Sequence, residues 1–222
     1  MKRLTISFDN GPLPGATDKI LDFLAARSVR ATFFVVGERL RDPDARRLAE
    51  RAKSEGHWIG NHTLTHGEPL GLSGARERVE TEIGEAQRLL GDLAHPQKLF
   101  RPNGNGTIGR HLLSPEALDY LVANQFTVVT WNNVPCDWDE VSAAGWAERA
   151  MDTLETLDWS LLVLHDEYQA RMMPILAAFY DRLVDKGIVV VQEFPECCVP
   201  LRCGQVTGAI EAIVSRPSVG GA

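Results

Sequence analysis

Two histidines stand four residues apart in this sequence, His62 and His66, directly after a short apolar run that begins at Trp58. Imidazoles at this spacing can reach one divalent cation if the backbone coils by about one turn after a strand. The pattern is weak on its own, because the chain's six histidines placed at random would give such a pair in roughly one chain in six. The pair therefore marks a candidate metal site that needs support from elsewhere.

Support comes from the N-terminal stretch 4–12, where an apolar strand runs into Asp9, Asn10 and a Gly-Pro turn. Both this stretch and the histidine segment end a strand in polar residues. Together they predict one mouth that is lined from the ends of several strands.

The composition is that of an ordinary globular chain. Its 222 residues are 44% hydrophobic and 24% charged, which suits one domain with one sizeable core. The net charge of -7 and the pI near 5.4 argue against a nucleic-acid or anionic-membrane partner, because both are held by clustered Lys and Arg.

No apolar run reaches the roughly 18 residues that span a bilayer, so membrane insertion is not expected. The N-terminus enters the first strand without the apolar core of a signal peptide, which predicts a cytoplasmic chain or one with a trimmed export signal. The four cysteines lack paired CxxC spacing and are expected to be free thiols: Cys136, Cys197, Cys198 and Cys203.

Seven strand-like segments alternate with helical ones. The β-branched and aromatic run at 31–37 is typical of a strand covered on both faces, as in parallel sheets. Ser73 stands in a helix-cap position, and Pro115 suits the first turn of the helix that starts at Ser114. The predicted strands are 4–9, 31–37, 58–61, 98–102, 126–131, 160–164 and 188–191, and the predicted helices are 18–27, 43–54, 73–93, from 114 onward, 141–157 and 172–185.

Strict alternation predicts a parallel sheet, either doubly wound or closed into a barrel. A doubly wound sheet concentrates its polar residues at one switch point, whereas a barrel distributes them over the ends of many strands. Here they follow different strands around the chain: Asp9, His62, Arg101, Asp137 and His165. We therefore expect a β/α barrel over residues 1–195, with 196–222 as a tail that belongs to the same domain or is loosely ordered.

Five ordered segments carry a resemblance to a known family. From about residue 4 to 195 the chain resembles the polysaccharide deacetylases with the NodB homology fold, through Phe-Asp-Asn-Gly-Pro at 8–12, Asn-His-Thr-Leu-Thr-His at 61–66, Arg-Pro at 101–102, Asp-Trp at 137–138 and Leu-His-Asp at 164–166. The resemblance implies an α/β fold, an irregular seven-stranded parallel β/α barrel. It also implies hydrolysis of a carbon-nitrogen amide bond, the removal of N-acetyl groups from an amino sugar or polysaccharide. Family members usually hold zinc with one aspartate and two histidines.

Carried over to this chain, the resemblance makes His62 and His66 ligands of a divalent metal, with the position of Asn10 supplying the third ligand. Asp9 becomes the base that takes a proton from the attacking water, which the cation acidifies. Arg101 becomes the cation that holds Asp9 ionised and oriented.

The remaining roles concern the substrate. The resemblance makes His165 the acid that protonates the departing amine. Backbone N–H groups near Asn103 and Gly104 are expected to stabilise the oxyanion. Trp138 is expected in the pocket wall, and Asp137 beside it at the substrate.

Three departures from the family pattern fall in the site. Asn10 replaces an aspartate, and an amide oxygen lacks the charge of a carboxylate, which lowers the expected metal affinity. The alternative is that Asn10 and Gly11 simply form a favourable turn pair. The stretch 101–106 reads Arg-Pro-Asn-Gly-Asn-Gly instead of Arg-Pro-Pro-aromatic-Gly, which opens one wall. Val134 stands where the family often has an aspartate, so His165 is expected to lack its usual partner unless Asp137 compensates.

Other polar and aromatic residues are assigned structural roles. His57, His95 and His111 match no motif and are expected outside the metal site. Asp166 should point to the opposite face of its strand from His165. Trp131 is expected in the core.

Two other functions remain open at this point. Some relatives with altered metal motifs open cyclic ureides without a metal, and the chain could instead be a catalytically silent carbohydrate-binding relative. Against a silent relative stands Asp9, because a binding module has no need of a base paired with Arg101 and opposed by His165.

Overall fold

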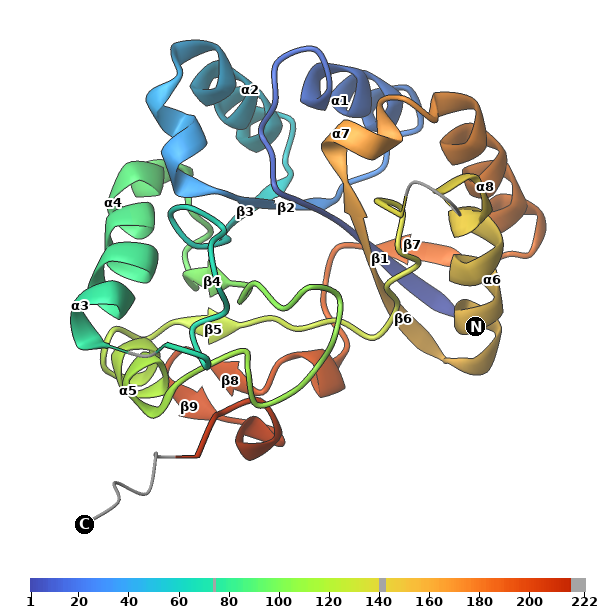
Figure 1. Cartoon of the computed structure of the whole chain (residues 1–222). Helices are drawn as coiled ribbons and strands as arrows, with labels where there is room; N and C mark the ends of the chain where they lie inside the picture. Colours follow the sequence, from blue (N-terminus) through green and yellow to red (C-terminus); the bar gives the residue numbers. More distant parts are fainter. Residues whose placement is uncertain (74, 140–142, 217–222) are drawn as a thin grey trace.

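The computed structural model describes residues 1–73, 75–139 and 143–216, and in it strands and helices alternate along the chain (Figure 1). All seven predicted strands are present, although several are shorter than their apolar runs. The strands are β1 (Arg3–Asp9), β2 (Thr32–Val35), β3 (Trp58–Asn61), β4 (Leu99–Phe100), β5 (Thr127–Val128), β6 (Trp159–His165) and β7 (Val189–Val191). The helices are α1 (Thr17–Ala26), α2 (Pro43–Ser54), α3 (Arg76–Val79), α4 (Ala86–Leu90), α5 (Pro115–Ala123), α6 (Trp146–Thr156), α7 (Asp166–Gln169) and α8 (Met173–Asp185).

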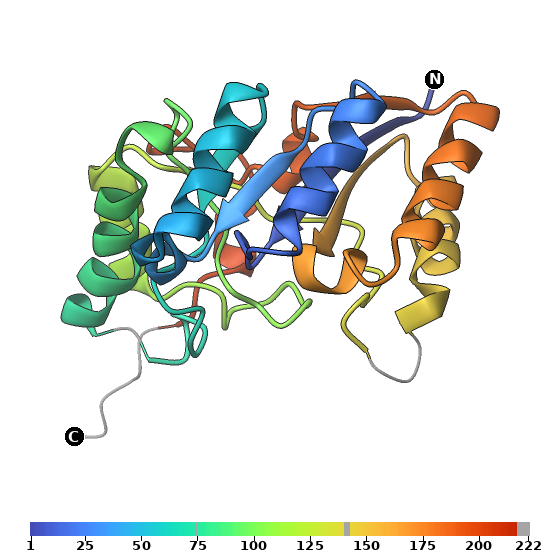
Figure 2. The same ribbon diagram turned by 90° about the horizontal axis from the view of Figure 1, so that it is seen from above.

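The parallel strands curl into an irregular barrel, in whose wall β1 pairs with three other strands. One edge of β1 pairs with β6 along its whole length, with Asp9 opposite His165. The other edge of β1 is shared, because β7 pairs with its first half and β2 with its second half. Strands β3, β4 and β5 follow β2 in order, and an isolated parallel bridge between Asn133 and Leu162 joins the end of β5 to β6. The expected β/α barrel is confirmed, and Figure 2 shows its helices along the outside of the sheet.

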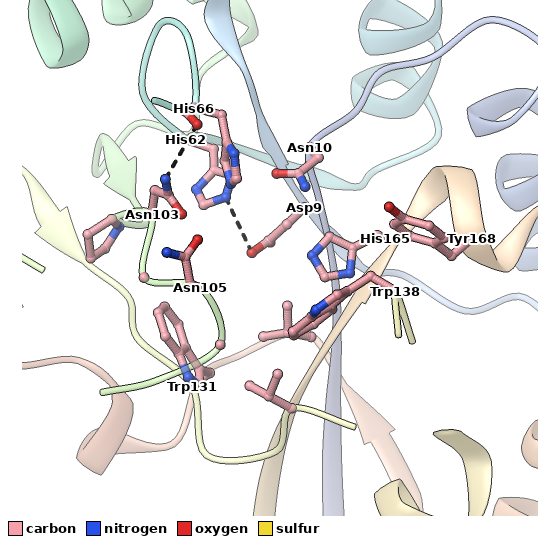
Figure 3. Close-up of a pocket in the computed structure, with 15 residues that line it drawn as sticks. Asp9, Asn10, His62, His66, Asn103, Asn105, Trp131, Trp138, His165 and Tyr168 are labelled. Atoms are coloured by element: carbon pink, nitrogen blue, oxygen red, sulfur yellow. Dashed lines mark hydrogen bonds and ion pairs between the residues drawn. The ribbon is translucent and has the colours of Figure 1, made fainter. Parts of the chain in front are cut away.

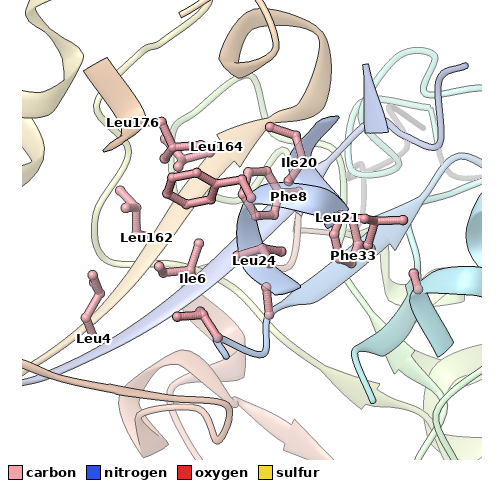
Figure 4. Packing of buried hydrophobic residues seen from close by; sticks show 14 of the residues in the cluster. Leu4, Ile6, Phe8, Ile20, Leu21, Leu24, Phe33, Leu162, Leu164 and Leu176 are labelled. Carbon is pink, nitrogen blue, oxygen red and sulfur yellow. The ribbon is translucent and has the colours of Figure 1, made fainter. Parts of the chain in front are cut away.

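The two faces of β1 explain how the barrel positions polar groups. Its apolar residues pack against α1, β6 and α8, in a cluster that includes Leu4, Ile6, Phe8, Ile20, Leu21, Leu24, Leu162, Leu164 and Leu176 (Figure 4). Thr5, Ser7 and Asp9 alternate with them and point the other way, toward the barrel interior. The same alternation that buries the apolar core therefore places a carboxylate inside the barrel at the end of β1.

The predicted helix 73–93 differs from its prediction in two respects. It begins at Arg76 rather than at Ser73, whose carbonyl accepts a hydrogen bond from the Arg78 side chain. It is also interrupted between α3 and α4 by a π-helical segment, Glu80–Glu85. Within that segment Glu82 accepts hydrogen bonds from the backbone N–H groups of Leu64 and Thr65, so the irregular turn directs a carboxylate at the histidine loop.

The predicted helix 141–157 begins later than expected, as α6 at Trp146, and residues 140–142 lie outside the described part of the chain. The tail continues as two short strands, β8 (Leu201–Arg202) and β9 (Gln205–Val206), with β8 antiparallel to β5. Leu201 and Ile213 are buried in the same cluster as Phe126, so the tail packs on the barrel as far as it is described; residues 217–222 lie outside the description.

The four cysteines are free thiols, as predicted. Within the described residues, no helix combines the length and apolar character needed to cross a lipid bilayer.

Candidate active site

The carboxyl ends of the strands surround one cavity of about 420 Å³. Figure 3 shows the residues that face it from β1, from the loops after β3, β4 and β5, and from the end of β6. The lining consists of Asp9, Asn10, His62, His66, Pro102, Asn103, Gly104, Asn105, Gly106, Trp131, Val134, Trp138, Val163, His165 and Tyr168. The five sequence segments therefore meet at a single mouth, as expected.

Asp9 and Arg101 form a buried ion pair at the base of this cavity. Arg101 Nη1 lies 2.7 Å from Asp9 Oδ1 and 2.7 Å from Ser7 Oγ, and the arginine side chain is fully buried. Burial by itself would raise the pKa of Asp9, but the Arg101 guanidinium, together with the nearby His62 and His165, holds that pKa below its ordinary value. Asp9 is therefore an ionised carboxylate in a position to accept a proton.

The two histidines project from a loop that is fixed by hydrogen bonds. Asn61 Oδ1 accepts a bond from the Thr63 backbone N–H, and Thr63 and His66 both adopt positive φ angles, 66° and 54°. The resulting coil brings the rings of His62 and His66 to 4.9 Å between centroids. This is the compact turn that the four-residue spacing required.

Both histidines are in the protonation state that binds metals. His62 Nδ1 lies 2.8 Å from the Arg101 carbonyl oxygen, which can only accept, so Nδ1 carries the proton and Nε2 keeps its lone pair. That Nε2 lies 3.6 Å from Asp9 Oδ2. Burial lowers the pKa of His62 to about 4, and burial also lowers the pKa of His66. Neutral imidazoles are therefore available at neutral pH.

Asn10 is the third candidate ligand. Its φ of 71° turns the backbone away after β1, and Figure 3 shows its amide oxygen directed toward His62 and His66. This oxygen is buried and accepts no hydrogen bond from the described residues. Within the same described ranges, no three His, Cys, Asp or Glu side chains are arranged around a common metal position. The orphaned Asn10 oxygen together with two neutral imidazoles is a donor set that fits a divalent ion.

His165 lies across the cavity from the two histidines and has a carboxylate partner. Its Nδ1 lies 2.7 Å from Oδ1 of Asp137, whose side chain is fully buried. Burial would lower the pKa of His165, but the hydrogen bond and charge of Asp137 outweigh burial and raise it. Of the two alternatives that Val134 left open, the structure shows the second: the loop after β5 brings Asp137 to His165 as a compensating partner.

Asp137 does not line the cavity, so its expected contact with substrate is wrong. It lies behind His165 because the loop turns inward there. Asn103, Gly104 and Trp138 do line the cavity, as expected. The Asn103 amide, however, donates to the Gly67 carbonyl and so braces the histidine loop.

Several residues that line the cavity were given no site role from the sequence, among them Asn105, Val163, Tyr168 and Trp131. Trp131 was assigned to the core, yet one side of its ring faces the cavity. Gly104 and Gly106 are required on either side of Asn105, because a Cβ on each would lie 2.8 Å from Trp131 and 2.9 Å from Trp138. The spacing of Tyr168, one helical turn after His165, was a usable signal.

His57, His95 and His111 are absent from the cavity lining. His57 is not a surface residue, however: it is buried, and its Nδ1 accepts a hydrogen bond from the Ala31 backbone N–H. Asp166 is buried and bonded to Thr17 on the outer face of the barrel, as expected.

Known proteins are similar to this chain in sequence and in fold. The chain is 36% identical over 173 residues to a chitooligosaccharide deacetylase of Rhizobium leguminosarum, covering 73% of this chain and 67% of that protein. It is 28% identical over 177 residues to a peptidoglycan-N-acetylglucosamine deacetylase of Bacillus cereus, covering 79% and 78%.

Solved structures of such proteins have the same fold as this chain. A peptidoglycan deacetylase of Bacillus subtilis superposes with a TM-score of 0.67 at 27% identity, covering 86% of this chain and 88% of that one. A family 4 acetyl xylan esterase of Clostridium thermocellum, solved with a cobalt ion, shares the fold with a TM-score of 0.71 at 23% identity, covering 86% and 88%. The sequence profile described as polysaccharide deacetylase matches residues 1–114, which is more than half of the 222. On these grounds the chain belongs to the polysaccharide deacetylase family.

Proposed function

We propose that this protein hydrolyses the N-acetyl amide of an N-acetylated amino sugar within an oligosaccharide or polysaccharide. The observation that carries the proposal is the meeting of an arginine-paired carboxylate, two neutral imidazoles and a carboxylate-paired imidazole around one cavity. The chitooligosaccharide and peptidoglycan deacetylases to which the chain is similar support this substrate class.

His62, His66 and Asn10 are the residues proposed to hold a divalent metal, with zinc as the first candidate. Two imidazole nitrogens and one amide oxygen leave positions open for water and substrate. A divalent cation bound there supplies Lewis acidity, polarising the amide carbonyl and acidifying water.

Asp9 is proposed as the base. It takes a proton from the water that attacks the acetamide carbon, and Arg101 keeps it ionised and correctly turned for that task. Arg101 also donates hydrogen bonds to the Ser7 hydroxyl and the Thr130 carbonyl. These bonds fix its guanidinium, and the fixed guanidinium in turn fixes Asp9.

His165 is proposed as the acid, on the opposite side of the cavity. Its raised pKa keeps the ring protonated at higher pH than an ordinary imidazole, so it can deliver a proton to the departing amine nitrogen. The open loop at Gly104 is proposed to offer a backbone N–H to the developing oxyanion. Trp131 and Trp138 are proposed to hold the sugar and acetyl group.

The test of the function is acetate release from N-acetylglucosamine oligomers by zinc-loaded protein. We expect release with the wild type and a large loss with His165→Gln, whereas His95→Gln, a change outside the cavity, should retain activity. Oligomer binding without any acetate release would instead support a silent carbohydrate-binding role.

The metal is tested separately, by calorimetric titration of chelator-stripped protein with zinc. We expect about one ion per chain, lost in His62→Ala and retained in His95→Ala. Asn10→Asp restores the charge of a carboxylate ligand and should tighten zinc binding by about tenfold. Absence of binding at millimolar zinc would contradict the metal site and favour amide hydrolysis without metal.

A further inference from the structure

Asp137 has a third residue behind it, Gln169, at the end of the short helix α7. Gln169 Nε2 lies 2.9 Å from Asp137 Oδ2, the oxygen that also accepts the His165 backbone N–H at 2.9 Å. The other oxygen, Oδ1, accepts the His165 ring proton. Gln169 and Asp137 are both fully buried, and neither lines the cavity. The two carboxylate oxygens are thus assigned to different donors.

The identity of Gln169 is not explained by packing. Its amide nitrogen must face Asp137, because an amide oxygen cannot bond a carboxylate, and its own Oε1 is left without a hydrogen-bond partner among the described residues. An unpaired buried carbonyl is destabilising, so packing alone would favour an apolar side chain of the same length. What the amide supplies in return is the donor to the Asp137 carboxylate.

The position of Gln169 in the chain fits a role in holding His165. Helix α7 starts directly after β6, so Gln169 follows His165 by four residues, about one helical turn. Asp137 comes from a different segment, 28 residues earlier. One segment therefore carries both the imidazole and the amide, and Asp137 is held between them.

We infer that Gln169 is a positioning residue that fixes the Asp137 carboxylate so that His165 keeps its proton on Nδ1 and presents Nε2 to the cavity. The inference deepens the proposed function, since its catalytic meaning rests on His165 being the acid. The proton that reaches the amine leaves from Nε2, so an imidazole that is turned or carries its proton on the wrong nitrogen is a poor donor.

The first test is the tautomer of neutral His165, measured from ring ¹⁵N chemical shifts in histidine-labelled protein, with His165→Gln used to assign the signals. In the wild type we expect the Nδ1–H form, as set by Asp137. In Gln169→Met, which keeps the length and removes the donor, we expect a mixture with the Nε2–H form. The matched control is Gln192→Met, because Gln192 donates to the backbone carbonyls of Ala31 and Gly56 and does not line the cavity. Its spectrum should match the wild type.

The second readout is kinetic. Gln169→Met should lower kcat by about tenfold with KM changed by less than about twofold, because the substrate does not contact this residue. In an Asp137→Asn background the same change should add less than about twofold, since an effect that passes through Asp137 disappears when the carboxylate is gone. If Gln169→Met lowers kcat by the same factor in the wild type and in the Asp137→Asn background, the inference is overturned.

If the methionine variant does not fold, Gln169→Asn provides the same test, since it keeps an amide but is one methylene too short to reach Asp137. Either folded variant with a wild-type tautomer and wild-type kcat would overturn the positioning role. The tautomer measurement needs no substrate. A protein that shows the tautomer change but hydrolyses no N-acetylated sugar would therefore contradict the proposed function and leave the positioning role standing.

Discussion

Two buried aspartates follow neighbouring strands of the barrel and behave in opposite ways. Asp9 ends β1 and is 4% exposed, and Asp166 follows β6 and is 1% exposed. Asp9 meets the Arg101 guanidinium, which lowers its pKa. Asp166 receives the hydroxyl of Thr17, and burial raises its pKa to about 6. Similar burial therefore accompanies opposite pKa shifts in this barrel, because Asp9 has a cationic partner on its side of the sheet and Asp166 has a hydroxyl.

The largest difference between the two is expected in activity. Asp9→Asn removes the proposed base and should lower acetate release by about 100- to 10,000-fold. Asp166→Asn changes the same side chain on the outer face and should leave release within about threefold of the wild type. Equal losses in the two variants, measured with zinc-loaded protein, would mean that Asp9 has no special place in the chemistry.

The next effect is on stability, through the partner of Asp9. Arg101→Met leaves a buried carboxylate unpaired and should cost about 3–5 kcal/mol in the free energy of unfolding at pH 7. In the wild type the lowered pKa of Asp9 contributes stability above its unfolded pKa, and this contribution is lost as pH falls through the folded pKa. In the variant, burial without the guanidinium raises the pKa of Asp9, so the carboxyl group takes up a proton as pH falls from 7 and the variant's deficit should shrink as the pH approaches 4.

Urea denaturation over this pH range measures the deficit. The control is Arg41→Met, which breaks an exposed pair with Glu85 and should change stability by no more than about 1 kcal/mol. A deficit for Arg101→Met that is independent of pH would show that the loss comes from packing against Phe34 and not from charge.

A smaller effect of opposite sign is expected at Asp166. Because its folded pKa of about 6 exceeds the ordinary value of 3.8, the folded chain holds a proton that the unfolded chain releases, and stability falls as pH rises between these values. Asp166→Asn removes that dependence. Relative to the wild type, the variant should gain about 2–3 kcal/mol on going from pH 4 to pH 8. A constant difference between the two proteins would contradict the raised pKa.

The smallest effect concerns the hydroxyl beside Asp166. Thr17→Val removes the donor to Asp166 and also the acceptor of the Leu13 backbone N–H, and should cost about 1–2 kcal/mol at pH 8. Thr17→Ser keeps the hydroxyl and should cost less. Thermal denaturation of the pair separates the hydrogen bond from the methyl group; equal losses would assign the effect to packing.

Much of the fold could be predicted from the sequence, because its signals are local. The apolar runs at 31–37 and 160–164 need only their own composition to indicate buried strands, and the Asp42 and Ser114 side chains cap their helices as the residue types suggest. The motifs could be placed at one mouth because parallel strands share an end. These inferences need no knowledge of which distant side chains touch.

What the sequence did not reveal depends on contacts between distant segments. The pairing of His165 with Asp137 spans 28 residues and depends on how the loop after β5 turns. The π-helical segment at Glu80–Glu85 carries Glu82, which accepts hydrogen bonds from a loop nearly twenty residues away, and no local sequence pattern indicates that contact. Trp131 was assigned to the core, and it is indeed buried. One side of its ring also faces the cavity, because Gly104, in another loop, has no side chain to cover it.

The bridge that closes the barrel between β5 and β6 gives the site a mechanical weak point. At this bridge the side chains of Asn132 and Asn133 largely replace the backbone hydrogen bonds of a regular strand pair. Asn132 accepts the Leu161 N–H, and Asn133 donates to the Ser160 hydroxyl of β6. We call the bridge and these two asparagines the clasp. Asp137 leaves this clasp on one side and His165 ends the strand on the other. Transient opening of the clasp would separate Asp137 from His165, the proposed acid, without moving His62 and His66. The backbone N–H of Val163, which bonds Asn133 across the clasp, should therefore exchange with solvent sooner than the amides between β1 and β6.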